Sequence, residues 1–290
     1  MIKTFYSKDW IDYELLDTGE GEKLEKLGKY RFIRPYENAV WLKSQKEEWK
    51  NFVGKFSSSK KGEKAGWTMK SKIESKWEMS YKGIKFLAMP TQFRHFGFFP
   101  EQAFHWDFIE EKIAKQNKSI RFLNLFGYTG VASLFALRAG AEVTHLDASK
   151  QSLAWAKDNQ KLSGLENLPM RIICDDALKF LEREIKRGNK YDAVIMDPPK
   201  FGRGPKGEIW KIEKMLPKLL ENVRKVLSDK PLFVILNSYA IDSSSLSLGY
   251  ALSEMMQDFE GKVEAGELCL LEKSKNRLIP LSNTVIWASS

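Results

Sequence analysis

The 290-residue sequence has 47 Lys and Arg against 38 Asp and Glu, and this formal net charge of +9 favours a polyanionic partner. Its 43% hydrophobic and 29% charged residues are ordinary for a globular protein and exclude a largely disordered chain. Two cysteines and three histidines without close spacing exclude a disulfide framework and a metal centre, and no apolar stretch is long enough for a membrane helix.

Residues 1–75 are expected to form a small β-rich domain. Short apolar runs alternate with turn sequences such as DTGEG at 17–21, which is the pattern of strands joined by tight turns. Acidic residues lie near the start, where a secretory signal would need an apolar core, so we expect a cytoplasmic location. Residues 76–99 alternate around Lys82 and Gly83 and predict a linking β-hairpin.

A basic segment over residues 50–76 carries eight lysines and two glutamates. Trp49, Phe52, Phe56 and Trp67 lie in it or beside it, and this mixture suits RNA contacts through phosphates and stacked bases. The alternative is a solvated lysine-rich loop whose aromatic residues belong to the core.

From Pro100 onward, residues 100–290 alternate between helical and strand patterns. Pro100 suits the first turn of a helix over 100–116. The expected strands are 120–126, 142–146, 170–174, 191–196 and 232–237, and the expected helices between them are 131–139, 150–162, 177–186 and 209–226. This rhythm predicts an α/β fold with a doubly wound, mostly parallel, Rossmann-like sheet of seven strands. Residues 261–273 and 283–289 would close it as an antiparallel edge hairpin.

Ligands of open α/β sheets bind beyond the carboxyl ends of the strands, so the loops after the first four strands are candidate sites. In the first loop, NLFGYTG, Gly127 and Gly130 would let the backbone approach a ligand closely. Tyr128 stands where a dinucleotide motif would have its middle glycine, which disfavours a nicotinamide cofactor. Asp147 has the spacing of a carboxylate that accepts both ribose hydroxyls. It could instead cap the next helix, a role that Ser149 could also take.

The third and fourth loops add further carboxylates. Asp176 is the preferred acceptor for the exocyclic amine of an adenine, with Asp175 as the alternative, and both could instead be helix-start acids favoured by the dipole. In the fourth loop Pro198 and Pro199 follow Asp197 directly. Prolines fix φ and remove N–H donors, so this loop is expected to be rigid, with carbonyls available to a substrate. A rigid turn without chemistry is the alternative.

Taken in order, these loops resemble those of the class I S-adenosylmethionine-dependent methyltransferases, over residues 98–290. That cofactor has no phosphate, which accounts for the missing middle glycine. NLFGYTG, HLDAS and DPPKFGRG are most similar to the bacterial large-subunit ribosomal-RNA methyltransferases that make 5-methylcytosine or 7-methylguanine. Members of that group carry an N-terminal RNA-binding module, often of PUA type, to which residues 1–75 would correspond.

The resemblance implies S-adenosylmethionine as cofactor and ribosomal RNA as substrate. The lead-in TQFRHFGFFPEQ is similar to the group's segment that helps hold the methionine end of the cofactor, whereas Asn124 stands where many methyltransferases have an acid. The implied cofactor contacts are Phe98, Gln102, Asn124, Phe126, Gly127, Thr129, Gly130, Asp147, Ala148, Ser149, Asp175, Asp176, Ala177 and Asp197.

One departure from the group concerns the nucleophile. Cytosine-C5 members attack the base with a cysteine thiolate after the fourth or fifth strand, and this sequence has no cysteine in either place. Cys174 and Cys269 are expected to be inert core residues. We therefore expect direct in-line transfer to a nitrogen or oxygen, with Asp197 as the nearest candidate base. The implied catalytic residues are Asp197, Pro198, Pro199, Lys200 and Tyr239.

Several alternatives stay open at this level. Lys200, Arg203 and Lys206 could meet phosphates or be solvated, and Asn237 and Tyr239 could orient the base or stack on it. A protein or small-molecule methyltransferase, a non-catalytic RNA-binding protein and a nicotinamide oxidoreductase are the rival functions. The target nucleotide and the oligomeric state, a homodimer included, are undetermined.

Overall fold

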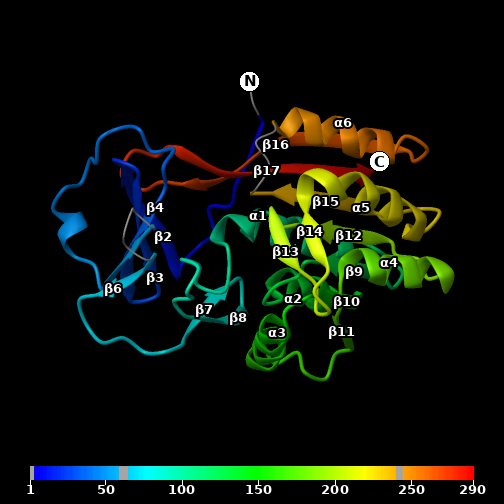
Figure 1. Cartoon of the computed structure of the whole chain (residues 1–290), viewed down its shortest axis with the longest axis horizontal. Coiled ribbons are helices and arrows are strands. Elements are labelled where there is room, and N and C mark those ends of the chain that lie inside the picture. Colours follow the sequence, from blue (N-terminus) through cyan, green and yellow to red (C-terminus); the bar gives the residue numbers. More distant parts are fainter. Residues whose placement is uncertain (1–2, 59–64, 240–243) are drawn as a thin grey trace. The chain divides into compact units, whose positions relative to one another are not determined.

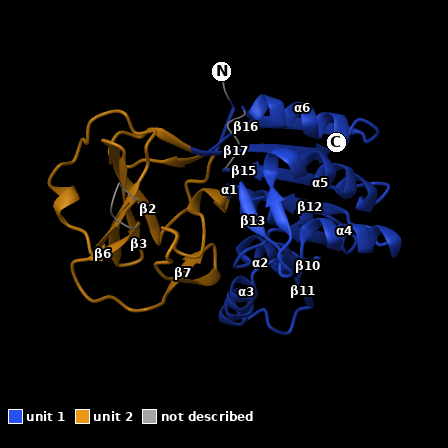
Figure 2. Cartoon of the chain, viewed as in Figure 1, with its two compact units in different colours: residues 1–5, 104–268, 281–290 blue, residues 6–103, 269–280 orange. Residues whose placement is uncertain are grey.

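The computed structural model describes residues 3–58, 65–239 and 244–290, and the chain divides into two compact units. Unit 1 comprises residues 1–5, 104–268 and 281–290, and unit 2 comprises residues 6–103 and 269–280 (Figure 2). The late segment 269–280 thus belongs with residues 6–103. The division into 1–75, 76–99 and 100–290 remains a prediction. Lys60, Lys61, Glu63 and Lys64 of the basic segment lie outside the described residues.

Unit 1 is built on an eight-stranded sheet, counted over the described residues, with the order β1-β16-β17-β15-β12-β9-β10-β11 (Figure 1). Four neighbouring pairs, from β15 through β12, β9 and β10 to β11, are parallel, and β17 is antiparallel to β15. The strands of this sheet are β1 (Lys3–Phe5), β9 (Arg121–Leu125), β10 (Glu142–Asp147), β11 (Met170–Cys174), β12 (Ala193–Met196), β15 (Phe233–Ser238), β16 (Gly261–Leu271) and β17 (Leu278–Ser289).

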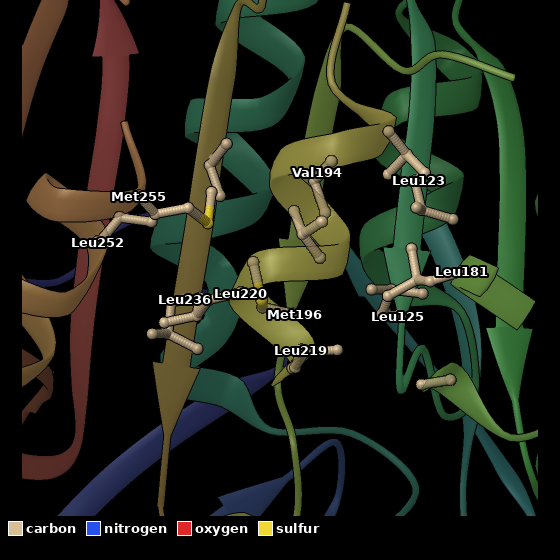
Figure 3. Close-up of a cluster of buried hydrophobic side chains, with 14 of the residues drawn as sticks. Leu123, Leu125, Leu181, Val194, Met196, Leu219, Leu220, Leu236, Leu252 and Met255 are labelled. Carbon is tan, nitrogen blue, oxygen red and sulfur yellow. The ribbon is translucent and has the colours of Figure 1, made fainter. Parts of the chain in front are cut away.

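Helices cover both faces of this sheet. Side chains alternate along each strand, so Leu123 and Val194 face one layer while Phe122 and Ile195 face the other. The first layer contains α4, α5 and α6, whose leucines pack on the sheet (Figure 3), and the second contains α1 and α2. The helices are α1 (Ala103–Ala114), α2 (Val131–Arg138), α3 (Lys150–Leu162), α4 (Ala177–Lys186), α5 (Ile212–Val226) and α6 (Ser245–Met255), and the 3₁₀ turn η2 (Pro100–Gln102) precedes α1. The predicted doubly wound α/β fold is confirmed.

Three details of unit 1 differ from the sequence-based expectation. Strand β1 pairs in parallel with β16, so the C-terminal hairpin is not at the sheet edge and the sheet has an eighth strand. Residues 209–211 form strand β14 (Ile209–Lys211), which pairs with β13 (Phe201–Arg203), so the helix after the fourth loop begins at Ile212 rather than at residue 209. Helix α6 was not anticipated. The first difference depends on a partner that is distant in the sequence, and the second on strands of three residues, which are too short for periodicity to reveal.

Unit 2 contains a five-stranded sheet with the order β2-β3-β4-β5-β6 and a separate hairpin. The hairpin, β7 (Trp77–Tyr81) with β8 (Ile84–Ala88), turns at Lys82 and Gly83 as predicted, and both turn residues have positive φ. The sheet strands are β2 (Tyr13–Gly19), β3 (Glu22–Leu27), β4 (Tyr30–Pro35), β5 (Gly54–Ser57) and β6 (Gly66–Met69), and a short 3₁₀ turn, η1, spans Glu48–Lys50. In the described part of the chain, no helix is long and apolar enough to cross a bilayer.

The aromatic residues of the basic segment belong to the core of unit 2. Trp49 and Phe56 are buried, and the Trp67 indole donates to the Thr91 carbonyl (2.8 Å) and packs edge-on against Phe56. The Lys70 ammonium lies 3.6 Å from the centre of the Phe52 ring. Base stacking by these aromatic residues is therefore not supported. The alternative of a lysine-rich surface over core aromatics describes them better.

A buried carboxylate, Asp17, ties three segments of unit 2 together. It accepts hydrogen bonds from Ser44 (main chain and hydroxyl), the Gln45 N–H, the Trp49 indole (2.7 Å) and the Ser274 hydroxyl (2.6 Å). Burial alone would raise the pKa of Asp17, but these hydrogen bonds outweigh it and lower the pKa to about 2. Asp17 thereby fastens the loop before η1 and the segment 269–280 to β2.

We predict that Asp17→Ala strongly destabilises the protein. The substitution leaves five donors without an acceptor, and a loss of about 3 kcal/mol or more in the free energy of unfolding is expected. Urea unfolding followed by tryptophan fluorescence measures this loss. Glu47→Ala removes an exposed carboxylate from the same loop region and should change the stability by less than about 1 kcal/mol. Equal stabilities of the two variants would contradict the role assigned to Asp17.

Candidate functional site

The predicted site residues lie at the carboxyl ends of the parallel strands of unit 1. Leu125 is level with Leu146 and Met196, and Met196 is level with Leu236. The next residue on each strand therefore falls in one row, and this row consists of Phe126, Asp147, Asp197 and Asn237. The chain runs outward from β9 to β10 and β11 and then returns to β12 on the other side of β9. The row thus spans the topological switch point, where open α/β sheets bind ligands.

The loop after β9 has an unusual backbone. Phe126 (φ 59°), Tyr128 (φ 52°) and Gly130 (φ 85°) all occupy the left-handed region. Non-glycine residues in this region cost about 1–2 kcal/mol each, and such strain concentrates at functional sites. The sequence gives no direct sign of this strain, because Phe and Tyr are not the residues expected at positive φ.

Gly127 is required by the packing of the protein itself. A Cβ at this position would lie 2.3 Å from His145 Cε1, so a side chain cannot be accommodated while His145 keeps its place. At Gly130 a Cβ would come within 2.9 Å of the Ala156 side chain. The two glycines were expected to allow a ligand to approach. The structure adds a reason that the sequence did not disclose, which is contact with β10 and α3.

A buried chain of hydrogen bonds supports this loop from below. The Asn124 amide donates to the Ser133 hydroxyl (2.9 Å), and this hydroxyl lies 3.0 Å from His145 Nδ1. His145 Nε2 lies 3.3 Å from the Tyr128 carbonyl. If the Ser133 hydroxyl donates to Nδ1, the proton of the neutral imidazole is on Nε2 and every contact has one donor and one acceptor. Asn124, implied as a cofactor contact, is thus engaged in holding the loop.

Asp147 is held by main-chain donors on both sides. The Tyr128 N–H donates to Oδ2 (2.9 Å) and the Ser149 N–H donates to Oδ1 (2.8 Å). Burial raises the pKa of Asp147, although these backbone hydrogen bonds oppose the shift. Ser149 caps α3 by accepting from the Ser152 N–H (3.1 Å), so Ser149 is the one of the two possible caps that takes this role. A carboxylate can accept about four hydrogen bonds, so Asp147 retains acceptor capacity for a further donor.

The third loop gives each of its acids a partner within the protein. Asp176 caps α4 by accepting from the Lys179 N–H (3.0 Å), and Asp175 forms an ion pair with Arg183. Asp175 also accepts from the Asp176 N–H (2.9 Å). Ala148 is half-buried beside this loop, and Ala177 is buried at the start of α4. Which of the two acids contacts an adenine remains a prediction.

The carbonyls of the fourth loop are used differently from the expectation. The Trp210 indole donates to the Pro199 carbonyl (2.6 Å), and the Ile212 N–H donates to the Lys200 carbonyl (3.1 Å). These two carbonyls are therefore bonded to β14 and α5 instead of being available to a substrate. The ring of Phe126 lies 5.0 Å from that of Trp210, which links the first loop to the fourth.

Asp197 is oriented by a relay of side chains. The Asn237 amide donates to Asp197 Oδ1 (3.0 Å), and the Ser282 hydroxyl donates to the Asn237 carbonyl oxygen (2.9 Å). Asn237 is fully buried, so it orients Asp197 and does not contact a base, contrary to one of the possibilities left open above. Tyr239, 37% exposed, follows on the same strand end, and Lys200 is exposed beside the prolines. Sequence reasoning missed Ser282, which only the pairing of β17 with β15 brings to the site.

The remaining predicted residues lie outside the row at the carboxyl ends of the strands, and one of them, Cys174, is more exposed than expected. Phe98 and Gln102 are buried residues of unit 2. Thr129 is buried, and its carbonyl accepts from the Asn159 amide (2.9 Å). Cys269 is buried as expected, whereas the expectation for Cys174 was wrong because this residue is exposed. Its strand, β11, is the edge of the sheet, and edge strands are covered less completely.

The residues present fit a nucleoside ligand without phosphates. A phosphate-binding loop offers free main-chain N–H groups, but here Gly127 donates to Leu146 (2.9 Å), Tyr128 to Asp147 and Gly130 to Gly127 (3.0 Å). Three loop donors are therefore already used within the protein. The half-buried Asp147 carboxylate can accept two neighbouring hydroxyl groups, as a ribose presents them. Occupied N–H groups in the loop disfavour the pyrophosphate of a nicotinamide dinucleotide. Together with the carboxylate acceptor, they suit S-adenosylmethionine, which has a ribose and no phosphate.

Comparison with known proteins gives consistent matches. The sequence profile of the S-adenosylmethionine-dependent methyltransferase family matches residues 38–250. The crystal structure of a S-adenosylmethionine-dependent methyltransferase from Agrobacterium tumefaciens is 40% identical, with a TM-score of 0.94, and the match covers 99% of this chain and 94% of that one. A methyltransferase-like structure from Streptococcus mutans shares the fold, with 17% identity, a TM-score of 0.71 and coverage of 97% and 76%.

Curated relatives match over shorter regions. Ribosomal RNA large subunit methyltransferase K from Neisseria meningitidis is 30% identical over 162 residues, which are 52% of this chain and 46% of that protein. Ribosomal RNA large subunit methyltransferase I from Aeromonas salmonicida is 33% identical over 120 residues, which are 41% and 29%. The chain thus spans less than half the length of each of these curated relatives.

We predict that acid destabilises the protein through its buried histidines. Burial lowers the pKa of His145 to about 4 and of His105 to about 3, and burial together with Arg34 lowers that of His95 to about 3. The unfolded chain binds these protons near pH 6.5, so the stability is complete above that pH and falls as the pH decreases. With three protons the slope reaches about 4 kcal/mol per pH unit at about pH 5, above the pKa values of the folded state and below that of the unfolded chain.

Urea titrations at several pH values measure this slope. His145→Gln removes one of the three groups and should lower the slope by about one third, even though the variant is less stable at every pH. An unchanged slope in this variant would show that His145 is not a source of the acid sensitivity.

Proposed function

Because the chain belongs to the S-adenosylmethionine-dependent methyltransferase family, we propose that it transfers a methyl group from this cofactor to a base of ribosomal RNA. The observation that carries the proposal is the single row of Phe126, Asp147 and Asp197 at the switch point of the sheet. The names of the curated relatives support RNA as the substrate, and the net charge of +9 suits a polyanion. Such a substrate corresponds to a cytoplasmic location.

In this proposal each part of the row has its own task. Asp147 accepts the two ribose hydroxyls of the cofactor, and Asp175 or Asp176 accepts the adenine amine. Phe126 and the prolines of the fourth loop bound the space between β9 and β12, where a flat base would be held. The cofactor supplies an activated methyl group on a sulfonium, so the protein contributes chiefly alignment and exclusion of water.

The proposed transfer is direct. Neither the sequence 197–200 nor the sequence 237–243 contains a cysteine, so a covalent adduct of the cytosine-C5 kind is not supported. A ring nitrogen such as guanine N7 has its own lone pair and needs no base. If the acceptor is an exocyclic amine or a hydroxyl, Asp197 takes its proton, and Asn237 and Ser282 hold this carboxylate in place.

The basic segment 50–76 enters the proposal only as a source of phosphate contacts. Its aromatic residues are packed within unit 2, so contacts from its exposed lysines, such as Lys72, would be independent of the base sequence. Phe98 and Gln102 are carried into the proposal on the resemblance alone.

We predict that Asp147→Asn weakens cofactor binding about 10-fold to 100-fold. The neutral amide presents one acceptor oxygen where the carboxylate presents two, and hydrogen bonds to a charged group are worth about 1.5–3 kcal/mol. Calorimetry with S-adenosylmethionine measures the affinity. Asp229→Asn changes an exposed acid before β15, at the opposite end of the strands, and should bind as the wild type does. Equal affinity in both variants would remove Asp147 from the cofactor site.

We predict that Asp197→Ala lowers methyl incorporation into RNA about 100-fold while cofactor affinity stays within a few-fold of the wild-type value. Labelled S-adenosylmethionine and ribosomal RNA from a strain that lacks the enzyme provide the assay. Ser282→Ala removes only the last member of the relay and should lower the rate less. Label that appears on protein alone would show that the RNA proposal is wrong, and an absence of cofactor binding would indicate a non-catalytic protein.

A further inference from the structure

Strands β13 and β14 form a two-stranded ribbon (Figure 1). The side chains on its two faces differ chemically. Register pairs Phe201 with Lys211 and Arg203 with Ile209, so these four side chains share one face, and Gly202 and Trp210 share the other. Trp210 is buried against unit 1, whereas Phe201 and Ile209 are 54% and 55% exposed. The outward face of the ribbon is defined here as Phe201, Arg203, Ile209 and Lys211.

This ribbon is firmly attached at both ends. At its root the Trp210 indole donates to the Pro199 carbonyl (2.6 Å) and packs on Phe126. At its tip Glu208 accepts from the Lys179 ammonium of α4 (2.6 Å), and its other oxygen accepts from the Lys206 N–H (2.9 Å). The outward face is therefore presented in a fixed orientation, directly continuous with the prolines that follow Asp197.

The composition of the outward face suits a nucleic acid strand. An exposed aromatic ring and an exposed aliphatic side chain alternate with two cations across the strands. Among the described residues, neither the Arg203 guanidinium nor the Lys211 ammonium has an ion-pair partner. Glu208, the acid within the ribbon, is paired with Lys179, and the exposed Glu213 follows Lys211 by two positions in the first turn of α5. Aromatic rings stack on bases of any sequence, and cations beside them contact the phosphates.

We propose that the outward face of the β13–β14 ribbon binds the RNA strand next to the target nucleotide, with Phe201 stacking on a neighbouring base and Arg203 and Lys211 contacting phosphates. The inference rests on the proposed function, because it assumes an RNA substrate. It places the stacking contact on this ribbon and not on the basic segment 50–76, where Phe56 is buried and the partly buried Phe52 and Trp67 are engaged with other side chains of unit 2. An acidic protein is a less fitting partner, because it could pair with the cations but would offer no planar base on which the Phe201 ring could stack.

The test separates the aromatic from the ionic contribution. With ribosomal RNA from a strain that lacks the enzyme, Phe201→Ala should lower kcat/KM about 10-fold to 100-fold without changing its salt dependence. Arg203→Gln with Lys211→Gln should lower kcat/KM and also reduce the slope of log kcat/KM against log salt concentration by about 2, since each phosphate contact contributes about 1. Phe201→Trp keeps a stacking ring and should retain at least half of the wild-type value.

Matched controls exclude general effects of charge and surface area. Lys186→Gln with Lys230→Gln removes two exposed cations near the amino ends of the strands, and Tyr250→Ala removes an exposed ring from α6. Both should leave kcat/KM and its salt slope unchanged. All variants should melt at the wild-type temperature and bind S-adenosylmethionine normally, because every substituted side chain is exposed.

The outcomes separate the inference from the function on which it rests. If the wild type methylates the RNA and the ribbon variants keep its kcat/KM and salt slope, the ribbon proposal is overturned and the proposed function stands. If the wild type transfers label only to protein, both are overturned. A loss of kcat/KM in the ribbon variants, with the expected split between stacking and salt slope and with unchanged controls, supports the proposal.

Discussion

The conformation of the loop after β9 is the constraint on which the site depends. Three of its residues adopt positive φ, and the buried imidazole of His145 lies where a side chain at position 127 would have to be. The hydrogen-bond chain from Asn124 through Ser133 to His145 ends on the Tyr128 carbonyl, and the Tyr128 N–H in turn fixes Asp147. The strained loop and the carboxylate beside it are thus held by one buried network. The hydrogen bonds of this network offset the unfavourable free energy of the residues at positive φ.

The two central carboxylates are held in different ways, and the difference matches their proposed tasks. Asp147 is fixed by main-chain donors, which cannot rotate away, and this rigidity suits recognition of a ribose. Asp197 is fixed by the amide of Asn237, itself held by Ser282 on the antiparallel strand β17. A side-chain relay can adjust when a substrate arrives, and this suits a group that receives a proton. Trp210 connects the loop after β9 with the loop after β12, because its ring packs on Phe126 and its indole N–H donates to the Pro199 carbonyl.

Cations and aromatic residues occur together in two parts of this chain, and their packing distinguishes the two. In the segment 50–76 Phe56 is buried, Phe52 and Trp67 are partly buried against other side chains of unit 2, and Lys55 pairs with Glu22. On the β13–β14 ribbon the aromatic and aliphatic side chains point outward beside cations that lack partners in the described residues. The two segments cannot be distinguished by their amino-acid composition, because both combine cations with aromatic residues. Burial assigns a structural task to the first set of aromatic residues and leaves the second set accessible to a ligand.

The sequence by itself determined the alternation of strands and helices in unit 1, since α3, α4 and β11 begin and end where the periodicity places them. It also placed Asp147 and Asp197 at the carboxyl ends of parallel strands and limited the cap of α3 to Asp147 or Ser149, because helix caps and strand ends are local features. Only the tertiary structure decided which distant segments meet. The pairing of β1 with β16, the position of Ser282 beside Asn237, the exposure of Cys174 and the contact that reserves position 127 for glycine all depend on this. A hydrophobic pattern records that a side chain is buried, but it does not record which residue covers it.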